Sequence, residues 1–162
     1  MSVDISIQLT VRQVQFDAGG HGIGEARNQL NGSSFVFIDR NYSLYITDTL
    51  NNRVMKWKEG AKEGVIVAGG NGAGDAMNQF YYPAAALVDA VGTIYVSDRS
   101  NSRIMRWTEG DTEGSVVVGG NGGGDRSDQL ALPFGLSFDH HGHLYVVDME
   151  NCRVQRFDMP LS

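Results

Sequence analysis

The chain has 162 residues, of which 41% are hydrophobic and 20% are charged, so it is long enough to form one ordinary soluble domain. Its net charge of −6 and its lack of a Lys- or Arg-rich run argue against a nucleic-acid partner, because phosphates attract basic patches. The single cysteine, Cys152, excludes a disulfide framework and a cysteine-rich zinc module within one chain.

The chain ends and the apolar runs carry no sign of a membrane segment. The first residues lack the basic region and long apolar core of a signal peptide, and no apolar run approaches the ~20 residues of a membrane span. We therefore expect no membrane association and, by default, a cytoplasmic protein.

The first predicted elements are a strand at residues 11–16 and a glycine-rich segment at 19–30, which returns at 69–80 and 119–130. The segment lacks the Lys-Ser/Thr pair of a phosphate-binding P-loop. It also lacks the nine-residue period of a calcium-binding β-helix. We interpret it as a connector between strands, in which glycines supply positive φ and close backbone approach.

A second motif follows each glycine-rich segment at a period of 50 residues. Residues 44–57 (LYITDTLNNRVMKW) return as 94–107 (IYVSDRSNSRIMRW) and as 144–157 (LYVVDMENCRVQRF) without an insertion. A fixed period of this length is typical of stacked structural units.

The middle unit shows what each repeat contains. We predict strands at 84–88, 94–98, 103–107 and 115–118, separated by turns at 89–92 and 109–114 and by a loop at 99–102. Four short antiparallel strands per unit indicate a β-propeller blade. The predicted fold is therefore an all-β partial β-propeller of about three four-stranded antiparallel blades, with an N-terminal strand that belongs to an incomplete blade.

The predicted organisation is a single propeller segment, 1–162. It consists of the N-terminal strand in 1–18, unit 1 at 19–68, unit 2 at 69–118, and unit 3 at 119–162, which lacks its last strand.

The residues that recur in every unit are assigned structural roles, because a catalytic residue is needed once and a scaffold residue in every blade. The predicted hairpin places Asp48 opposite Arg53, and Leu44 opposite Trp57. We expect each aspartate also to accept N–H bonds from its own turn. The recurring ion pairs and core aromatics are Asp48, Arg53, Trp57, Asp98, Arg103, Trp107, Asp148, Arg153 and Phe157.

These combined motifs resemble NHL repeats. The resemblance rests on the glycine-rich loop, Leu132-Pro133 or Tyr82-Pro83, the Leu-Tyr-Val-x-Asp strand and Asn-x-Arg-Val/Ile, and it covers about residues 18–157. The first unit departs from the pattern at Ser33-Ser34. The resemblance implies a β-propeller, commonly six-bladed, that mostly acts as a binding platform for proteins or RNA. A distant enzyme relative, the peptidyl-hydroxyglycine amidating lyase, carries metal-binding histidines in its channel.

Three units are too few to close a ring, since propellers typically have about 4–8 blades. The chain begins with a predicted strand of the kind that unit 3 lacks. We therefore predict either a homodimer that completes a six-bladed ring or further blades in a longer chain.

The favoured function is a non-catalytic interaction scaffold that presents loops to a protein or peptide, with no cofactor and no assigned catalytic or metal-binding residue. Candidate binding residues are those in the loops that differ between units. They are His21, Arg40, Tyr42, Arg99, Arg126, His140 and Met149.

Two alternatives remain. A hydrolase or lyase with a channel metal would draw on His140, His141 and His143, but adjacent residues of one turn do not converge well on an ion. RNA binding would need one basic face. That face would be built from Arg40, Arg53, Arg99, Arg103, Arg126 and Arg153.

Overall fold

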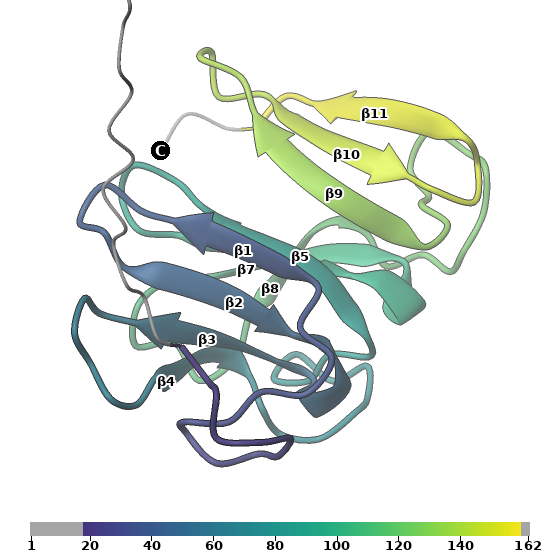
Figure 1. The fold of residues 1–162 in the computed structure, drawn as a ribbon. Helices are drawn as coiled ribbons and strands as arrows, with labels where there is room; N and C mark the ends of the chain where they lie inside the picture. The colour runs from purple at the N-terminus through teal and green to yellow at the C-terminus, as the bar shows by residue number, and fades with distance from the viewer. Residues whose placement is uncertain (1–17, 160–162) are drawn as a thin grey trace, which may run out of the picture.

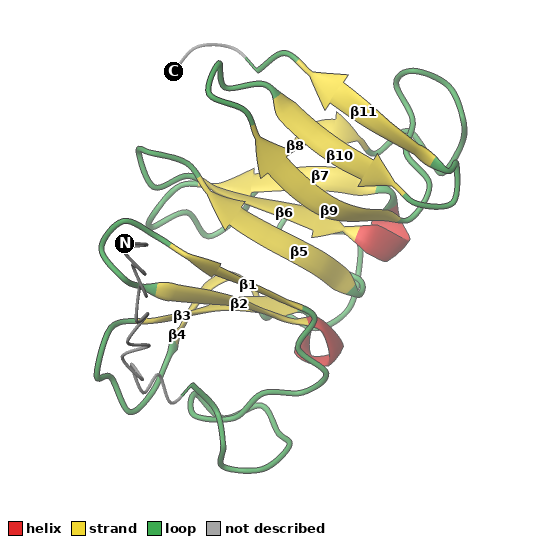
Figure 2. Ribbon diagram, turned by 45° about the horizontal axis from the view of Figure 1, so that its top comes forward, coloured by secondary structure: helices red, strands yellow, loops and turns green. Residues whose placement is uncertain are grey.

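A computed structural model describes residues 18–159 of the chain, so the strand predicted at 11–16 lies outside the described residues. The described part forms three antiparallel sheets that follow one another along the chain (Figure 1). The inner strands of the three sheets lie side by side, β1 against β5 and β5 against β9 (Figure 2). The fold is a partial β-propeller.

Each sheet is one blade, with its strands in chain order. Blade 1 contains β1 (Phe35–Ile38), β2 (Leu44–Asp48), β3 (Arg53–Trp57) and β4 (Val65–Gly69). Blade 2 contains β5 (Pro83–Val88), β6 (Ile94–Asp98), β7 (Arg103–Trp107) and β8 (Ser115–Gly119). Blade 3 contains β9 (Pro133–Phe138), β10 (Leu144–Asp148) and β11 (Arg153–Phe157).

The predicted hairpin register is the observed one. Asp48 pairs with Arg53 and Leu44 with Trp57, and the same pairing returns in the other two blades. The predicted four-residue loop at 99–102 connects β6 and β7, and within it Arg99–Asn101 form a 3-10 turn, η2, that ends in Ser102 at φ 52°. The equivalent turn of blade 1 is η1 (Thr49–Asn51).

The antiparallel order gives each blade two different ends. The end that we call the hairpin end carries the turns 39–43, 58–64, 89–93, 108–114 and 139–143. The opposite end, which we call the glycine-loop end, carries η1, η2, the equivalent turn 149–152 and the glycine-rich connectors.

The core lies between neighbouring blades. Trp57 and Trp107 are each 1% exposed, and Phe80 from a glycine-rich connector packs against Trp107 with the ring centroids 4.8 Å apart. Phe157, predicted to be equally buried, is only half-buried, because within the described residues blade 3 has no fourth strand or turn to cover it as those at Gly64 and Gly114 cover Trp57 and Trp107. No helix in residues 18–159 has the length and apolar character needed to cross a membrane.

Candidate functional site

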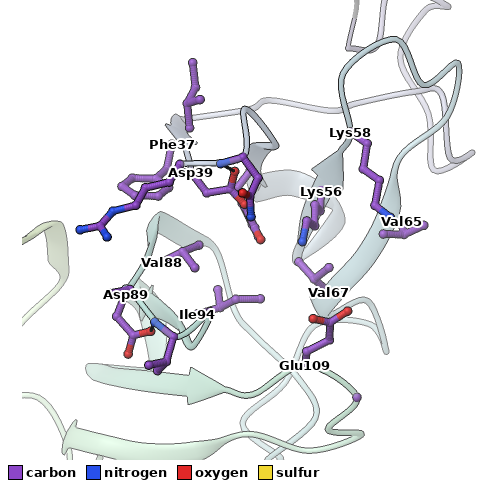
Figure 3. A pocket seen from close by; sticks show the side chains of 18 of the residues that line it. Phe37, Asp39, Lys56, Lys58, Val65, Val67, Val88, Asp89, Ile94 and Glu109 are labelled. Atoms are coloured by element: carbon purple, nitrogen blue, oxygen red, sulfur yellow. Dashed lines mark hydrogen bonds between the residues drawn. The ribbon is translucent and has the colours of Figure 1, made fainter. Parts of the chain in front are cut away.

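A groove of about 900 Å³ opens between blades 1 and 2 at the hairpin end (Figure 3). Its walls are the turn 39–41 and the strand β4 of blade 1, and the turns 89–92 and 109–111 of blade 2. Both hairpins of blade 1 and both of blade 2 therefore contribute to it.

The floor of the groove is apolar, and one residue explains why the space is open. Where blade 2 meets blade 3, Phe138 packs edge-on against Tyr95 with centroids 5.0 Å apart. The equivalent position between blades 1 and 2 is Val88, which is too small to fill the space beside Tyr45. Tyr45 packs instead on Phe37 of its own blade, at 6.4 Å. A valine in place of a phenylalanine thus leaves a hollow.

The blade 1 rim of the groove is mainly basic and the blade 2 rim is acidic. Arg40, Lys56 and Lys58 lie on the blade 1 side beside one carboxylate, Asp39, and Asp89, Glu109 and Asp111 lie on the blade 2 side. Figure 3 shows Lys56 and Glu109 pointing from opposite sides toward Val67. Among residues 18–159, none of these seven side chains forms an ion pair. Asp39, Asp89 and Asp111 accept backbone N–H groups of their own turns, so the charges most available to a ligand are those of the basic side chains and Glu109.

Lys56 is held in the groove by an aromatic contact. Its Nζ lies 5.1 Å from the centre of the Tyr45 ring, within cation–π range. A hydrogen bond with Tyr45 raises the pKa of Lys56, and partial burial opposes this shift only in part. Burial also raises the pKa of Tyr45. At neutral pH the groove thus presents an ammonium group beside a neutral phenol.

The first turn of each blade is fixed by an aspartate. Asp39 Oδ1 accepts the backbone N–H groups of Asn41 and Ser43, and Asp89 Oδ1 accepts those of Val91 and Thr93. Such side-chain turns hold a loop in one conformation. The turn residues that line the groove are therefore preorganised.

The corresponding turn of blade 3 contains an additional side-chain hydrogen bond. Asp139 Oδ2 lies 2.9 Å from His143 Nδ1, and Oδ1 accepts the N–H groups of His141 and His143. Desolvation disfavours the charged carboxylate, but the hydrogen bonds from His143 and His141 outweigh it and lower the pKa of Asp139 well below its usual range. His143 Nε2 also lies 3.4 Å from Asp158.

At the glycine-loop end, the recurring Asp, Asn and Arg form a clamp on the connector. Asp48 Oδ2 accepts Arg53 Nε at 2.7 Å and Asn51 Nδ2 at 2.8 Å. Arg53 then donates to the carbonyls of Glu25, Ala26 and Gln29, and Asn51 to that of Gly24. The same bonds recur around Arg103 and Arg153.

The clamp corrects one expectation about the aspartates. Their Oδ1 atoms accept an N–H not from their own turn but from the connector: Asn31 for Asp48, Tyr81 for Asp98 and Ala131 for Asp148. In blade 2, burial outweighs these bonds and raises the pKa of Asp98. In blade 3, burial still opposes the charge, but the bonds from Ala131, Asn151 and Arg153 prevail and lower the pKa of Asp148.

The candidate binding residues from the sequence are divided between the two ends. Arg40, Tyr42 and His140 lie at the hairpin end, and His21, Arg99, Arg126 and Met149 at the glycine-loop end. Of these seven, only Arg40 lines the groove. Arg126 pairs with Asp128 at 3.2 Å, with both side chains exposed.

Sequence reasoning missed the other groove residues, although a signal for them was present. The motif position of Val88 is Ile in unit 1 and Phe in unit 3, and the position of Lys58 is Thr and Asp in the other units. Comparison of units would have marked these positions as variable. Only the structure shows that they face one space.

The residues of the two alternative functions are not gathered into a site. His140, His141 and His143 stack along one turn, and no group of three His, Cys, Asp or Glu in the described part of the chain is arranged to hold a metal ion. Of the six arginines, Arg53, Arg103 and Arg153 are bound in clamps, and Arg40 lies at the opposite end from Arg99 and Arg126.

Comparison with known proteins supports the architecture. No protein-family profile and no curated protein matches the chain. Among solved structures, the chain is similar to an auxiliary nutrient binding protein from Bacteroides thetaiotaomicron, with a TM-score of 0.61 and 17% identity over 75% of this chain and 36% of that one. It is also similar to virginiamycin B lyase from Staphylococcus aureus, with a TM-score of 0.52 and 13% identity over 84% of this chain and 44% of that one.

These similarities establish a β-propeller-like fold and nothing finer. The chain spans 36% and 44% of the lengths of the two proteins, less than half in each case. A second nutrient binding protein, from Bacteroides ovatus, gives the same picture with a TM-score of 0.55, 15% identity, and coverage of 75% of this chain and 36% of that one.

Proposed function

We propose that this chain is an NHL-type propeller segment that acts as a non-catalytic interaction scaffold and binds an extended peptide segment in the groove between blades 1 and 2. The observation that carries the proposal is the pair of oppositely charged rims on either side of an apolar floor. None of the charged side chains that line the groove is ion-paired within residues 18–159. Unpaired charges around an apolar floor are typical of a recognition site.

The lining defines the chemistry of the partner. An aliphatic or aromatic side chain fits the floor of Phe37, Val88 and Ile94. An acidic residue on one side of it meets Lys56, and a basic residue on the other side meets Glu109. The volume of about 900 Å³ lies near the upper end of the range of about 300–1,000 Å³ for ligand sites, so it has room for the side chains of a short peptide. The rigid turns lower the entropy lost on binding.

The direct test is binding of short synthetic peptides that place Glu and Arg on opposite sides of a central Leu or Phe at varied spacing. Affinity is measured by fluorescence polarisation. We expect one spacing to bind, and Val88→Phe to abolish binding by filling the floor as Phe138 fills the next interface. Lys56→Ala and Glu109→Ala each remove one rim charge and should weaken binding about two- to five-fold.

The turns 58–64 and 108–114, which border the groove, also provide matched control residues. Lys62 and Glu113 are exposed and lie outside the groove, so Lys62→Ala and Glu113→Ala should leave binding unchanged. If no peptide of the set binds, or if Val88→Phe binds as well as the wild type, the groove is not the peptide site.

A lyase or hydrolase function with a channel metal has no comparable support. The likeness to virginiamycin B lyase is one of fold at 13% identity. Stoichiometric zinc or calcium in the purified protein would reverse this order of preference.

A further inference from the structure

One packing arrangement is used twice along the chain. Val54 and Ala68 of blade 1 pack with Phe80, which lies in the connector before β5, and with Ala86, which belongs to β5 of blade 2. Fifty residues later, Ile104 and Val118 of blade 2 pack with Leu130 and Leu136 in the same way. Each blade therefore has a forward face, which covers the next blade, and a receiving face, which the preceding blade covers.

Two of these faces are exposed, one of them only along one strand. On the forward face of blade 3, Val154 is 63% exposed, whereas the equivalent Val54 and Ile104 are 0% exposed. On the receiving face of blade 1, Val36 and Ile38 of β1 are 55% and 54% exposed, whereas the equivalent Ala86 and Val88 are 1% and 9% exposed. The other apolar residues of that face, such as Met55 and Trp57, are buried. Because the internal interfaces pair these same two faces, the open face of blade 3 is the natural complement of the open face of blade 1.

The outer edge of blade 3 is open too. In the complete blades β3 pairs with β4, and β7 with β8. Within residues 18–159, β11 pairs only with β10. Its outer edge therefore presents unpaired backbone donors and acceptors, which template the addition of a strand.

Gly19 has the backbone conformation of the glycines that end the fourth strand of the complete blades. Gly69 and Gly119, at the ends of β4 and β8, have φ of 68° and 74°, and a Cβ there would clash with the backbone oxygens of Asn52 and Ser102. The N–H groups of the next glycine in each connector donate to those same oxygens.

Gly19 has the same positive φ, 80°, yet a Cβ there would meet only the Leu30 side chain. The connector before blade 1 thus has the backbone shape that, in the other two connectors, fits around the second turn of the preceding blade. In unit 3 the residue equivalent to Asn52 and Ser102 is Cys152, which has the same left-handed conformation, φ 51°.

We propose that a second copy of this chain covers both open faces, so that two copies related by a two-fold axis form one ring of six blades. Each interface then repeats the internal one: blade 3 of one copy covers blade 1 of the other. The result lies within the usual range of about 4–8 blades.

The register of the internal pairs fixes the contacts. Arg53 pairs with Gly69 and Val54 with Ala68, and the same offset holds in blade 2. Arg153 of one copy therefore pairs with Gly19 of the other, and Val154 with Ala18. This chain carries both complementary faces, so a second copy can supply the contact that each of them lacks.

The test is the mass of the full chain by light scattering. We expect twice the 17.6 kDa of one chain for the wild type. Val154→Arg and Val36→Arg should each reduce it to one chain while the thermal melt stays cooperative, because both side chains are already exposed in the single copy. The matched control is Val91→Arg, since Val91 is 74% exposed but lies on neither open face, and it should keep the double mass.

A cross-link tests the register. With Cys152→Ser as background, Ala18→Cys combined with Val154→Cys should give a disulfide-linked pair of chains on mild oxidation, and neither single cysteine should. A wild-type mass of one chain would overturn the proposal and leave further blades of one polypeptide as the occupant. A pair of chains broken only by Val91→Arg would overturn it as well.

Discussion

Blades 2 and 3 have nearly the same sequence motif but differ in burial. Asp98 and Arg103 of blade 2 form a salt bridge with side chains 0% and 6% exposed, and the matching Asp148 and Arg153 form one with side chains 0% and 31% exposed. Trp107 is 1% exposed and Phe157 is half-buried. The local hairpin is fixed by the repeat itself, whereas the burial of Arg153 and Phe157 depends on a fourth strand, which blade 3 lacks within residues 18–159.

The largest difference in stability between the two blades is expected for the aromatic residues that end their third strands, Trp107 of β7 and Phe157 of β11. Trp107→Ala should lower the free energy of unfolding by about 3–5 kcal/mol, because it empties a fully packed site. Measured in the Val36→Arg single chain, where no second copy covers blade 3, Phe157→Ala should cost less than half of that, since part of its surface already contacts water. Chemical denaturation of both variants measures the two losses, and equal losses would contradict the difference between the blades.

The next largest difference in stability is expected for the Asp–Arg clamps of blades 2 and 3. Arg103→Ala leaves Asp98 buried without its charge partner and should cost about 3–5 kcal/mol. In the same Val36→Arg single chain, Arg153→Ala should cost about 1–3 kcal/mol, because water can replace part of the lost hydrogen bonding around the more exposed pair. Thermal melts of the two variants at one pH decide the order, and a larger loss for Arg153→Ala would contradict it.

Single substitutions at positions 138 and 88 should open a groove between blades 2 and 3 and close the one between blades 1 and 2. Phe138→Val removes the edge-on contact with Tyr95 and should open a second groove at a cost of about 1–2 kcal/mol. Val88→Phe should close the first groove with a smaller change in stability. A crystal structure of each variant would show the space directly, and an unchanged groove in the Val88→Phe variant would contradict our explanation of its origin.

The smallest effect is expected for the turn aspartates. The folded-state pKa of Asp139 lies below its ordinary value, so its contribution to stability is present above the unfolded value of about 3.9 and is lost as the pH falls below it. The wild type should therefore lose more stability between pH 5 and pH 2, roughly the range of carboxylate titration, than Asp139→Asn does. Parallel acid dependence of the two melts would contradict this assignment. Asp89→Asn is the matched comparison in blade 2.

The sequence predicted the strands and their pairing well because an uninterrupted 50-residue repeat constrains them. Asp48 and Arg53 are opposite each other as expected. The clamp partners were not predictable, because Glu25, Ala26 and Gln29 contribute backbone carbonyls, which leave no trace in the identity of the residue.

The groove was not predicted for a different reason. It depends on the absence of bulk at Val88 and on Lys56, Lys58 and Glu109, which come from two blades and from separate turns and strands. Each residue alone is an ordinary surface residue. Their convergence follows from how blade 1 and blade 2 pack together.

Hydrogen exchange of the full chain, with and without the tightest-binding peptide of the set, tests the central claim most directly. We expect slower exchange of the amides in 56–67 and 88–94, which line the groove, and no change in 138–147, where Phe138 fills the equivalent space. Protection confined to the connectors 69–80 and 119–130 would place the peptide at the opposite end of the blades and contradict the account.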